Sequence, residues 1–166
     1  MLSLNDESIK NTAAWEAAGV QPLQFDRSKM VQATKEKPVW VHFGAGNIFR
    51  GFIAMLQQRL LNEGKAEQGI IAIETYDEEI IEKIYRPYDN LGLQVIMNAD
   101  GSFEKTIIGS LANGLVGDSS EPADWKALQE IFRQPSLQMA SFTITEKGYK
   151  IKNLQGEYTA EVVGDI

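Results

Sequence analysis

Apolar positions in the first half of the chain change from strand-like runs to a helix-like spacing and back. The run 39–43 is β-rich and ends at Gly44, and the run 69–73 is continuously apolar and closes at Glu74. Between them, apolar side chains recur at the spacing of a helix face, at Ile48, Phe49, Phe52, Ile53, Leu56, Leu60 and Leu61. The pattern predicts a strand–loop–helix–strand unit over 39–74, long enough for a parallel crossover.

The remaining sequence adds further helices and strands. We expect helices over 6–18, 77–85 and 121–134, a hairpin of strands 93–97 and 103–108 that turns at Asp100-Gly101, a strand over 137–145 and a second hairpin in the tail, 149–166. This order predicts an α/β fold with a Rossmann-type doubly wound, mostly parallel sheet and a β-hairpin insertion. We predict only about four core strands where a complete fold of this type has about six, so we expect the fold to be incomplete.

The composition is that of an ordinary globular protein, and the net charge disfavours some classes of binding partner. The chain has 166 residues, 43% of them hydrophobic and 23% charged, which suits one domain with a core. A net charge of −7 opposes binding to nucleic acid or to an anionic membrane. With no cysteine and a single histidine, disulfides, thiolate or multi-histidine metal sites and a cysteine nucleophile are excluded. The polar N-terminus lacks a signal-peptide pattern, so we expect a cytoplasmic location.

The segment between the first strand and the helix, FGAGNIFRG at 43–51, has the pattern of a phosphate-binding loop. In such a loop Gly44 permits the sharp turn, Gly46 lets the backbone approach a pyrophosphate, and the helix start supplies free amides. The predicted cofactor-binding residues are Gly44, Ala45, Gly46, Asn47, Ile48, Phe49 and Arg50. Phe49 stands where the third glycine of the GxGxxG pattern falls, so an ordinary strand-to-helix turn is the alternative. Arg50 is predicted either to reach a phosphate or to form a surface salt bridge.

A carboxylate closes the second predicted strand, where dinucleotide folds contact the adenosine ribose. Glu74 can accept hydrogen bonds from both ribose hydroxyls and would repel a 2′-phosphate, which favours NAD over NADP. Asp77 is the alternative residue for this role, and a solvated strand terminus is the alternative interpretation of Glu74. His42, inside the first strand, is expected to be a core histidine and not a general base.

Two segments of the chain resemble the long-chain mannitol dehydrogenase family. The first is the glycine-loop stretch 42–51, and the second is TITEKGY at 143–149, which is similar to a TITEGGY segment of that family, with Lys147 in place of its first glycine. The lead-in at Phe25-Asp26-Arg27 also resembles the family's N-terminal arm, and the stretch 73–77 is most similar to its fructuronate reductase (D-mannonate oxidoreductase) branch. On this resemblance Thr145 joins the predicted cofactor-binding residues.

The resemblance implies an N-terminal NAD(P)-binding Rossmann domain followed by a largely helical substrate domain. Hydride would pass between nicotinamide and a carbinol carbon of a sugar alcohol or aldonate, with a lysine as the base and no zinc. Those catalytic motifs lie downstream in the family, so we assign no catalytic residue here. The predicted division is an N-terminal arm over 1–37 and a truncated NAD-binding domain over 38–166, with the C-terminal substrate domain absent.

Other functions remain open at the level of sequence. An S-adenosylmethionine-dependent methyltransferase also has a glycine loop after its first strand and an acid after its second. A nucleotide-binding module without chemistry of its own is the third hypothesis. Under the leading hypothesis the partners are NAD and a small sugar alcohol or sugar acid, and the chain alone is inactive. An unpaired sheet edge and an uncovered face also predict self-association.

Overall fold

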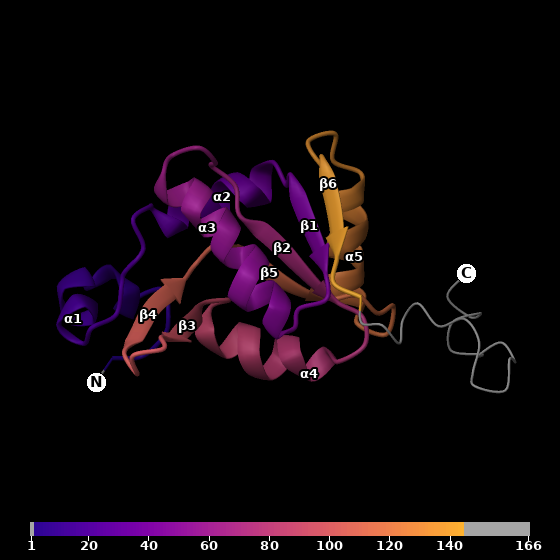
Figure 1. Ribbon diagram of the computed structural model, residues 1–166. Coiled ribbons are helices and arrows are strands. Elements are labelled where there is room, and N and C mark those ends of the chain that lie inside the picture. The colour runs from indigo at the N-terminus through magenta and orange to yellow at the C-terminus, as the bar shows by residue number, and fades with distance from the viewer. Residues whose placement is uncertain (1, 145–166) are drawn as a thin grey trace, which may run out of the picture.

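A parallel sheet of four strands lies at the centre of residues 2–144, the part of the chain that the computed structural model describes (Figure 1). Its strand order is β5-β2-β1-β6, where the strands are β1 (Trp40–Phe43), β2 (Ile70–Glu74), β5 (Leu111–Val116) and β6 (Met139–Phe142). All neighbouring pairs are parallel, so the four carboxyl ends meet at one edge of the sheet. The winding direction reverses between β1 and β6, which makes their carboxyl ends a topological switch point.

Helices cover both faces of this sheet. On one face lie α3 (Ala54–Asn62), preceded by the π-helical turn η2 (Phe49–Ile53), and α4 (Glu78–Ile80), which continues into η3 (Ile81–Tyr85). On the other face α5 (Pro122–Phe132) packs on β1, β2 and β5, and α2 (Arg27–Glu36) lies beside it. The alternation of β1 divides its side chains between the two cores, with Val41 facing α5 and His42 stacked on Phe49 of the α3 side.

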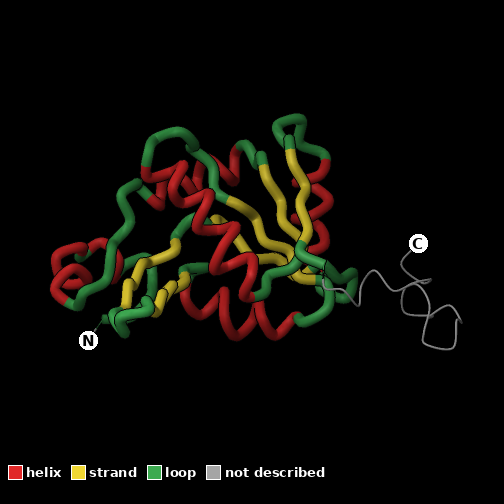
Figure 2. The backbone as a smooth tube through the Cα atoms, in the orientation of Figure 1, coloured by secondary structure: helices red, strands yellow, loops and turns green. Residues whose placement is uncertain are grey.

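The N-terminal arm and a hairpin form a smaller unit beside the sheet (Figure 2). The arm contains η1 (Ser8–Lys10) and α1 (Thr12–Ala17), and the antiparallel hairpin consists of β3 (Gly92–Met97) and β4 (Phe103–Ile108), which follow the short turn η4 (Arg86–Tyr88). Trp15 and Val20 of the arm share a core with Leu91 and Ile107. Gln21 also pairs with β4 through backbone hydrogen bonds, so the arm is packed against the hairpin.

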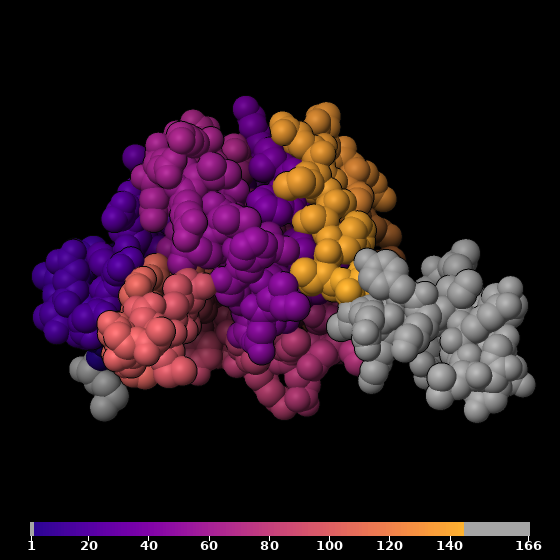
Figure 3. Space-filling view, viewed as in Figure 1, coloured from indigo at the N-terminus to yellow at the C-terminus, as the bar shows by residue number. Residues whose placement is uncertain are grey.

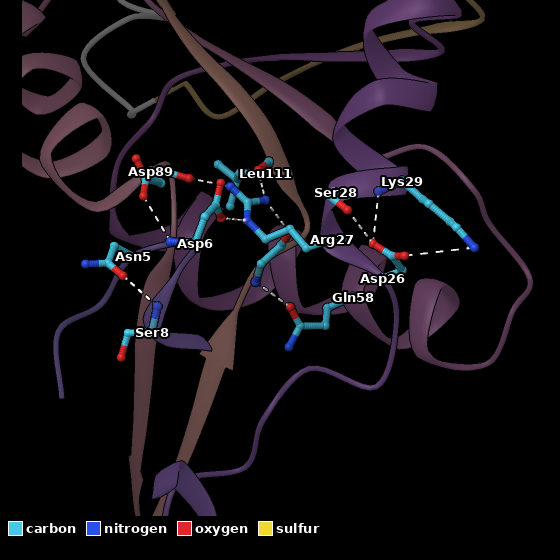
Figure 4. Close-up of polar contacts among 11 residues, drawn as sticks. Asn5, Asp6, Ser8, Asp26, Arg27, Ser28, Lys29, Gln58, Asp89 and Leu111 are labelled. Carbon is cyan, nitrogen blue, oxygen red and sulfur yellow. Dashed lines mark hydrogen bonds and ion pairs between the residues drawn. The ribbon is translucent and has the colours of Figure 1, made fainter. Parts of the chain in front are cut away.

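A buried arginine connects the arm with the start of β5 (Figure 4). Arg27 is 6% exposed, and its Nε donates to the Asp6 carboxylate at 2.7 Å. Its Nη1 donates to the carbonyls of Gly109 and Leu111 at 2.9 and 2.8 Å, and its Nη2 donates to the carbonyl of Asp89. The guanidinium therefore joins segments that are far apart in the sequence, and each of its nitrogens has an oxygen acceptor.

The predicted α/β architecture, the parallel crossover over 39–74 and the β3–β4 hairpin are confirmed. The prediction of one helix over 6–18 is wrong, because the Asn11 side chain accepts from the Ala14 amide and starts a separate helix there. Strand β5 was not predicted at all. The tail hairpin over 149–166 lies outside the described residues. None of the helices within residues 2–144 has the length and apolar character to cross a membrane.

Candidate functional site

The glycine loop leaves β1 at the carboxyl edge of the sheet, in a conformation that requires glycine. Gly44 has φ +101°, and its amide donates to the carbonyl of Ile73 at 2.8 Å. A Cβ on Gly44 would lie 2.5 Å from the Thr143 hydroxyl oxygen and 2.9 Å from its carbonyl oxygen. The expectation that Gly44 permits a sharp turn is thus confirmed, because backbone angle and space both exclude a side chain.

Beyond Gly44 the loop opens to the outside and starts the helix. Among the described residues, and apart from its chain neighbours, no atom lies within 4 Å of the place where a Cβ on Gly46 would stand. The first helical hydrogen bond runs from the Arg50 amide to the Gly46 carbonyl at 3.1 Å, so the amides of residues 47–49 have no carbonyl in a preceding turn. Asn47 and Ile48 are exposed. This end of the helix carries a partial positive charge and suits an anion.

Phe49, at the position of the third glycine, belongs to the core. It is fully buried, and its ring stacks on the His42 imidazole with centroids 4.3 Å apart. The side chain therefore faces the sheet and contributes nothing to the loop surface. An aromatic ring replaces the usual glycine here because it fills the space between the helix and β1.

The Glu74 carboxylate lies beside the loop but is turned toward backbone amides. Its Oε2 accepts from the Ala45 amide at 2.8 Å, and its Oε1 accepts from the amides of Thr75 and Tyr76 at 3.1 Å each and of Asp77 at 3.4 Å. Glu74 is only 7% exposed, whereas the side chains of residues 75–77 are exposed. Glu74 therefore holds the loop and the following turn together, and Asp77 is the exposed carboxylate next to it.

Two further side chains complete the surroundings of the loop. The Tyr85 hydroxyl donates to the Ala45 carbonyl at 2.9 Å, and burial raises the pKa of Tyr85 well above its ordinary value. Arg50 donates to the Asn47 side chain, and none of the ion pairs within residues 2–144 includes it, in contrast to the predicted alternative of a salt bridge. No local pattern indicates a role for Tyr85, which lies forty residues from the loop residue that it contacts.

The single histidine is buried and neutral. His42 is fully buried, and desolvation lowers its pKa to about 4. Its ring nitrogens contact the hydroxyls of Ser141, in β6, and of Thr143, directly after that strand. The expectation of a core histidine agrees with this placement. Thr145, like Glu146 and Lys147 after it, lies outside the described residues.

Comparisons with known proteins point to one group of oxidoreductases. No protein-family model matches the chain. The chain is 53% identical over 165 residues to a D-mannonate oxidoreductase of Thermotoga maritima, covering 99% of this chain and 30% of that protein. It is 30% identical over 151 residues to a mannitol 2-dehydrogenase of Aspergillus clavatus, covering 89% and 28%.

A solved structure supports the fold. The mannitol 2-dehydrogenase of Pseudomonas fluorescens, in a ternary complex with NAD and D-mannitol, matches with a TM-score of 0.73 and 21% identity over 95% of this chain and 30% of that one. The chain thus spans about 30% of the length of the relatives that it matches.

Proposed function

We propose that this chain, which belongs to the long-chain mannitol dehydrogenase family, binds NAD(H) for an oxidoreductase that acts on a sugar alcohol or an aldonate. The observation that carries the proposal is the glycine loop, which places a helix N-terminus at the switch point between β1 and β6. The D-mannonate oxidoreductase relative, and the NAD complex of the structural neighbour, support the same cofactor and substrate class.

The residues present fit a dinucleotide. Within residues 2–144 nothing fills the space over Gly46, so it admits a pyrophosphate. The amides of Asn47 and Ile48 begin the helix and have no carbonyl partner in a preceding turn. Arg50 adds a positive charge without a carboxylate partner in the same residues. Bound NAD supplies a hydride acceptor at its nicotinamide ring. In this arrangement Glu74 orients the loop, and the exposed carboxylate of Asp77 is available to the adenosine ribose and disfavours a 2′-phosphate.

A matched pair of glycine substitutions tests the pyrophosphate site. In the part of the chain that the structure describes, no neighbouring atom lies within 4 Å of a would-be Cβ on Gly46 or Gly51, and neither has a positive φ. Alanine should therefore leave the fold intact at both. Gly46→Ala should weaken NADH binding at least about tenfold, roughly 1.4 kcal/mol, because its methyl group occupies the phosphate space. Gly51→Ala, one helical turn further on, should bind NADH like the wild type.

Titration calorimetry with NADH, NADPH and S-adenosylmethionine measures this directly. The proposal expects NADH to bind best and S-adenosylmethionine not to bind. Preference for S-adenosylmethionine would support the methyltransferase alternative. Equal NADH affinity of the two alanine variants would refute the proposal that the pyrophosphate binds over Gly46. Circular dichroism of both variants checks that the fold is retained.

Hydride transfer needs a substrate site and a general base in addition to the cofactor site, and we assign neither to this chain. We assign residues 1–37 to an arm and 38–166 to the NAD-binding domain, and place the substrate site and the general base in the remaining length found in the relatives. The chain mixed with NAD and D-mannonate should give no NADH absorbance above background, and robust turnover would refute this division. A cytoplasmic location belongs to the same proposal, as expected for a cysteine-free metabolic enzyme.

We also propose that the isolated chain self-associates. Helix α3, at the front of the molecule in Figure 3, and the residues before it expose a stripe of apolar side chains at every fourth position: Ile48, Phe52, Leu56 and Leu60. In residues 2–144, β6 pairs on one side only. Leu56→Lys should lower the apparent mass in sedimentation velocity at high concentration, and the exposed control Arg59→Lys should not. A wild-type monomer at every concentration would refute the proposal.

A further inference from the structure

We propose that His42 and Thr143 are positioning residues for the cofactor loop, because they belong to a hydrogen-bonded chain that holds the first peptide group of the loop in place. The positioning role rests on the proposed NAD(H) function, because a loop is positioned here only for the sake of a cofactor. The hydrogen-bonded chain itself consists of described residues and can be tested without a cofactor.

The hydrogen-bonded chain crosses from β1 to β6 and back, beside the switch point between these two strands. His42 and Ser141 are register partners in the parallel pair, so their side chains lie on the same face of the sheet. The links run from Trp40 Nε1 to Ser141 Oγ (2.7 Å), Ser141 Oγ to His42 Nδ1 (2.7 Å), His42 Nε2 to Thr143 Oγ1 (3.2 Å) and Thr143 Oγ1 to the Gly44 carbonyl oxygen (3.2 Å). Each length is that of a hydrogen bond.

The Gly44 end of the hydrogen-bonded chain determines its direction. The Gly44 carbonyl only accepts, so the single Thr143 hydroxyl proton is donated to it, and the Thr143 oxygen accepts from the imidazole. The proton of His42 therefore lies on Nε2. Because His42 is fully buried and desolvation lowers its pKa to about 4, the ring is neutral and Nδ1 carries a lone pair. The Ser141 hydroxyl then donates to Nδ1, while its oxygen accepts from the Trp40 indole N–H.

The final link acts on one particular peptide group. The carbonyl that accepts from Thr143 belongs to the peptide between Gly44 and Ala45, and the N–H of that same peptide donates to Glu74. The peptide plane is thus held from β6 on its oxygen side and from β2 on its nitrogen side. Such a clamp is needed because Gly44, at φ +101° and without a Cβ, gives the peptide little resistance to rotation.

The clamp lies directly ahead of the groups that are proposed to bind phosphate. Rotation of the Gly44–Ala45 peptide would redirect Gly46 and the amides after it, so the loop would bind a dinucleotide only in the fraction of molecules that is correctly oriented. The Ala45 carbonyl, held by Tyr85, continues the same restraint into the next peptide. The hydrogen bonds that link Trp40, Ser141, His42 and Thr143 therefore pre-organise the loop without contact to the cofactor.

Thr143→Val and Thr143→Ser test the inference in the whole 166-residue chain. Valine has the shape of threonine but no hydroxyl, and serine keeps the hydroxyl, so serine is the conservative control. Thr143→Val should raise the Kd for NADH by about five- to tenfold, with Thr143→Ser close to the wild type. Thermal unfolding of both variants shows how much of the change is stability alone.

Nitrogen NMR of the imidazole gives a readout that a merely structural role would not move. His42 is the chain's only histidine, so its two ring nitrogens need no further assignment. The wild type should show the neutral Nε2–H form at neutral pH, Thr143→Val should shift the balance between the tautomers, and Thr143→Ser should restore it. An Nδ1–H or protonated imidazole in the wild type would overturn the hydrogen-bonded chain.

The two experiments separate this inference from the proposed function. Equal NADH affinity of the valine and serine variants, with the expected tautomer in the wild type, would overturn the positioning role and leave the cofactor site standing. A wild-type chain that binds no NADH would overturn the proposed function and the role of the clamp in it, while the NMR result would still decide whether the hydrogen-bonded chain exists.

Discussion

Replacing Glu74 by glutamine removes an acceptor on which several backbone amides depend. The two carboxylate oxygens accept from four amides, one in the glycine loop and three in the turn after β2, at 2.8 to 3.4 Å. Glutamine has one acceptor oxygen and one NH₂ group. Whichever way the amide is turned, its NH₂ faces either the Ala45 amide or the turn amides, and donors then oppose donors.

The size of the effect follows from the charge and burial of the group. A hydrogen bond to a charged acceptor contributes about 1.5–3 kcal/mol, and either the single bond to Ala45 or the three bonds to the turn amides are lost. The turn amides lie among exposed residues and regain some hydration, which reduces the cost. We therefore expect Glu74→Gln to lower the free energy of unfolding by about 2–4 kcal/mol.

Urea unfolding followed by circular dichroism at neutral pH measures this, with Asp77→Asn as the matched control. Asp77 is an exposed carboxylate three residues away, so its substitution should change stability by less than about 0.5 kcal/mol. A loss below about 1 kcal/mol for Glu74→Gln would show that the loop does not depend on this carboxylate. The explanation of how Glu74 orients the loop would then be wrong.

Three further outcomes follow from the structure. Arg27→Met should cost about 3–5 kcal/mol in urea unfolding, because it strips a buried guanidinium from three carbonyls and the Asp6 carboxylate; a cost under about 1 kcal/mol would contradict this role. Because His42 takes up a proton from pH 6.5 downward when unfolded but only near 4 when folded, the unfolded state binds more protons between these values. Wild-type stability should therefore fall by about 3 kcal/mol from pH 6.5 to 4 relative to His42→Gln, and parallel pH profiles of the two would refute it. Asp77→Ser should narrow the preference for NADH over NADPH in calorimetry, and an unchanged ratio would show that another group contacts the ribose.

Local sequence patterns were enough for the elements whose signals are local. The apolar run of β1, the glycines after it and the second apolar run predicted a parallel crossover, and Asp100-Gly101 predicted the hairpin, with Gly101 at φ +83°. Strand β5 was missed because Asn113-Gly114 lies in its middle and is a typical turn pair. A Cβ on Gly114 would lie only 3.0 Å from Tyr85 Cδ1 and 3.2 Å from Ile81 Cδ1, a tight packing that favours glycine and that no local pattern reveals.

Helix α3 shows the same limit in its orientation. Its leucines at 56 and 60 fit the predicted apolar face, yet both are 42% exposed, whereas Gln58 is 1% exposed. Hydrogen bonds explain this orientation: the Gln58 side chain donates to the Ile107 carbonyl near the end of β4 and accepts from the Gly109 amide just after β4. Buried backbone groups need partners, and this requirement outweighs the apolar pattern of one helix face.

The sequence by itself determined the parallel crossover, the glycine turn and the acid at the end of the second strand, because these depend on backbone angles and on neighbours a few residues apart. Only the tertiary structure decided what the acid and the histidine do. Glu74, Tyr85 and Thr143 reach the loop from segments 29 to 99 residues away, and sheet order brings them there. Contacts between such distant segments depend on strand register and helix orientation, which are set by the packing of the whole domain.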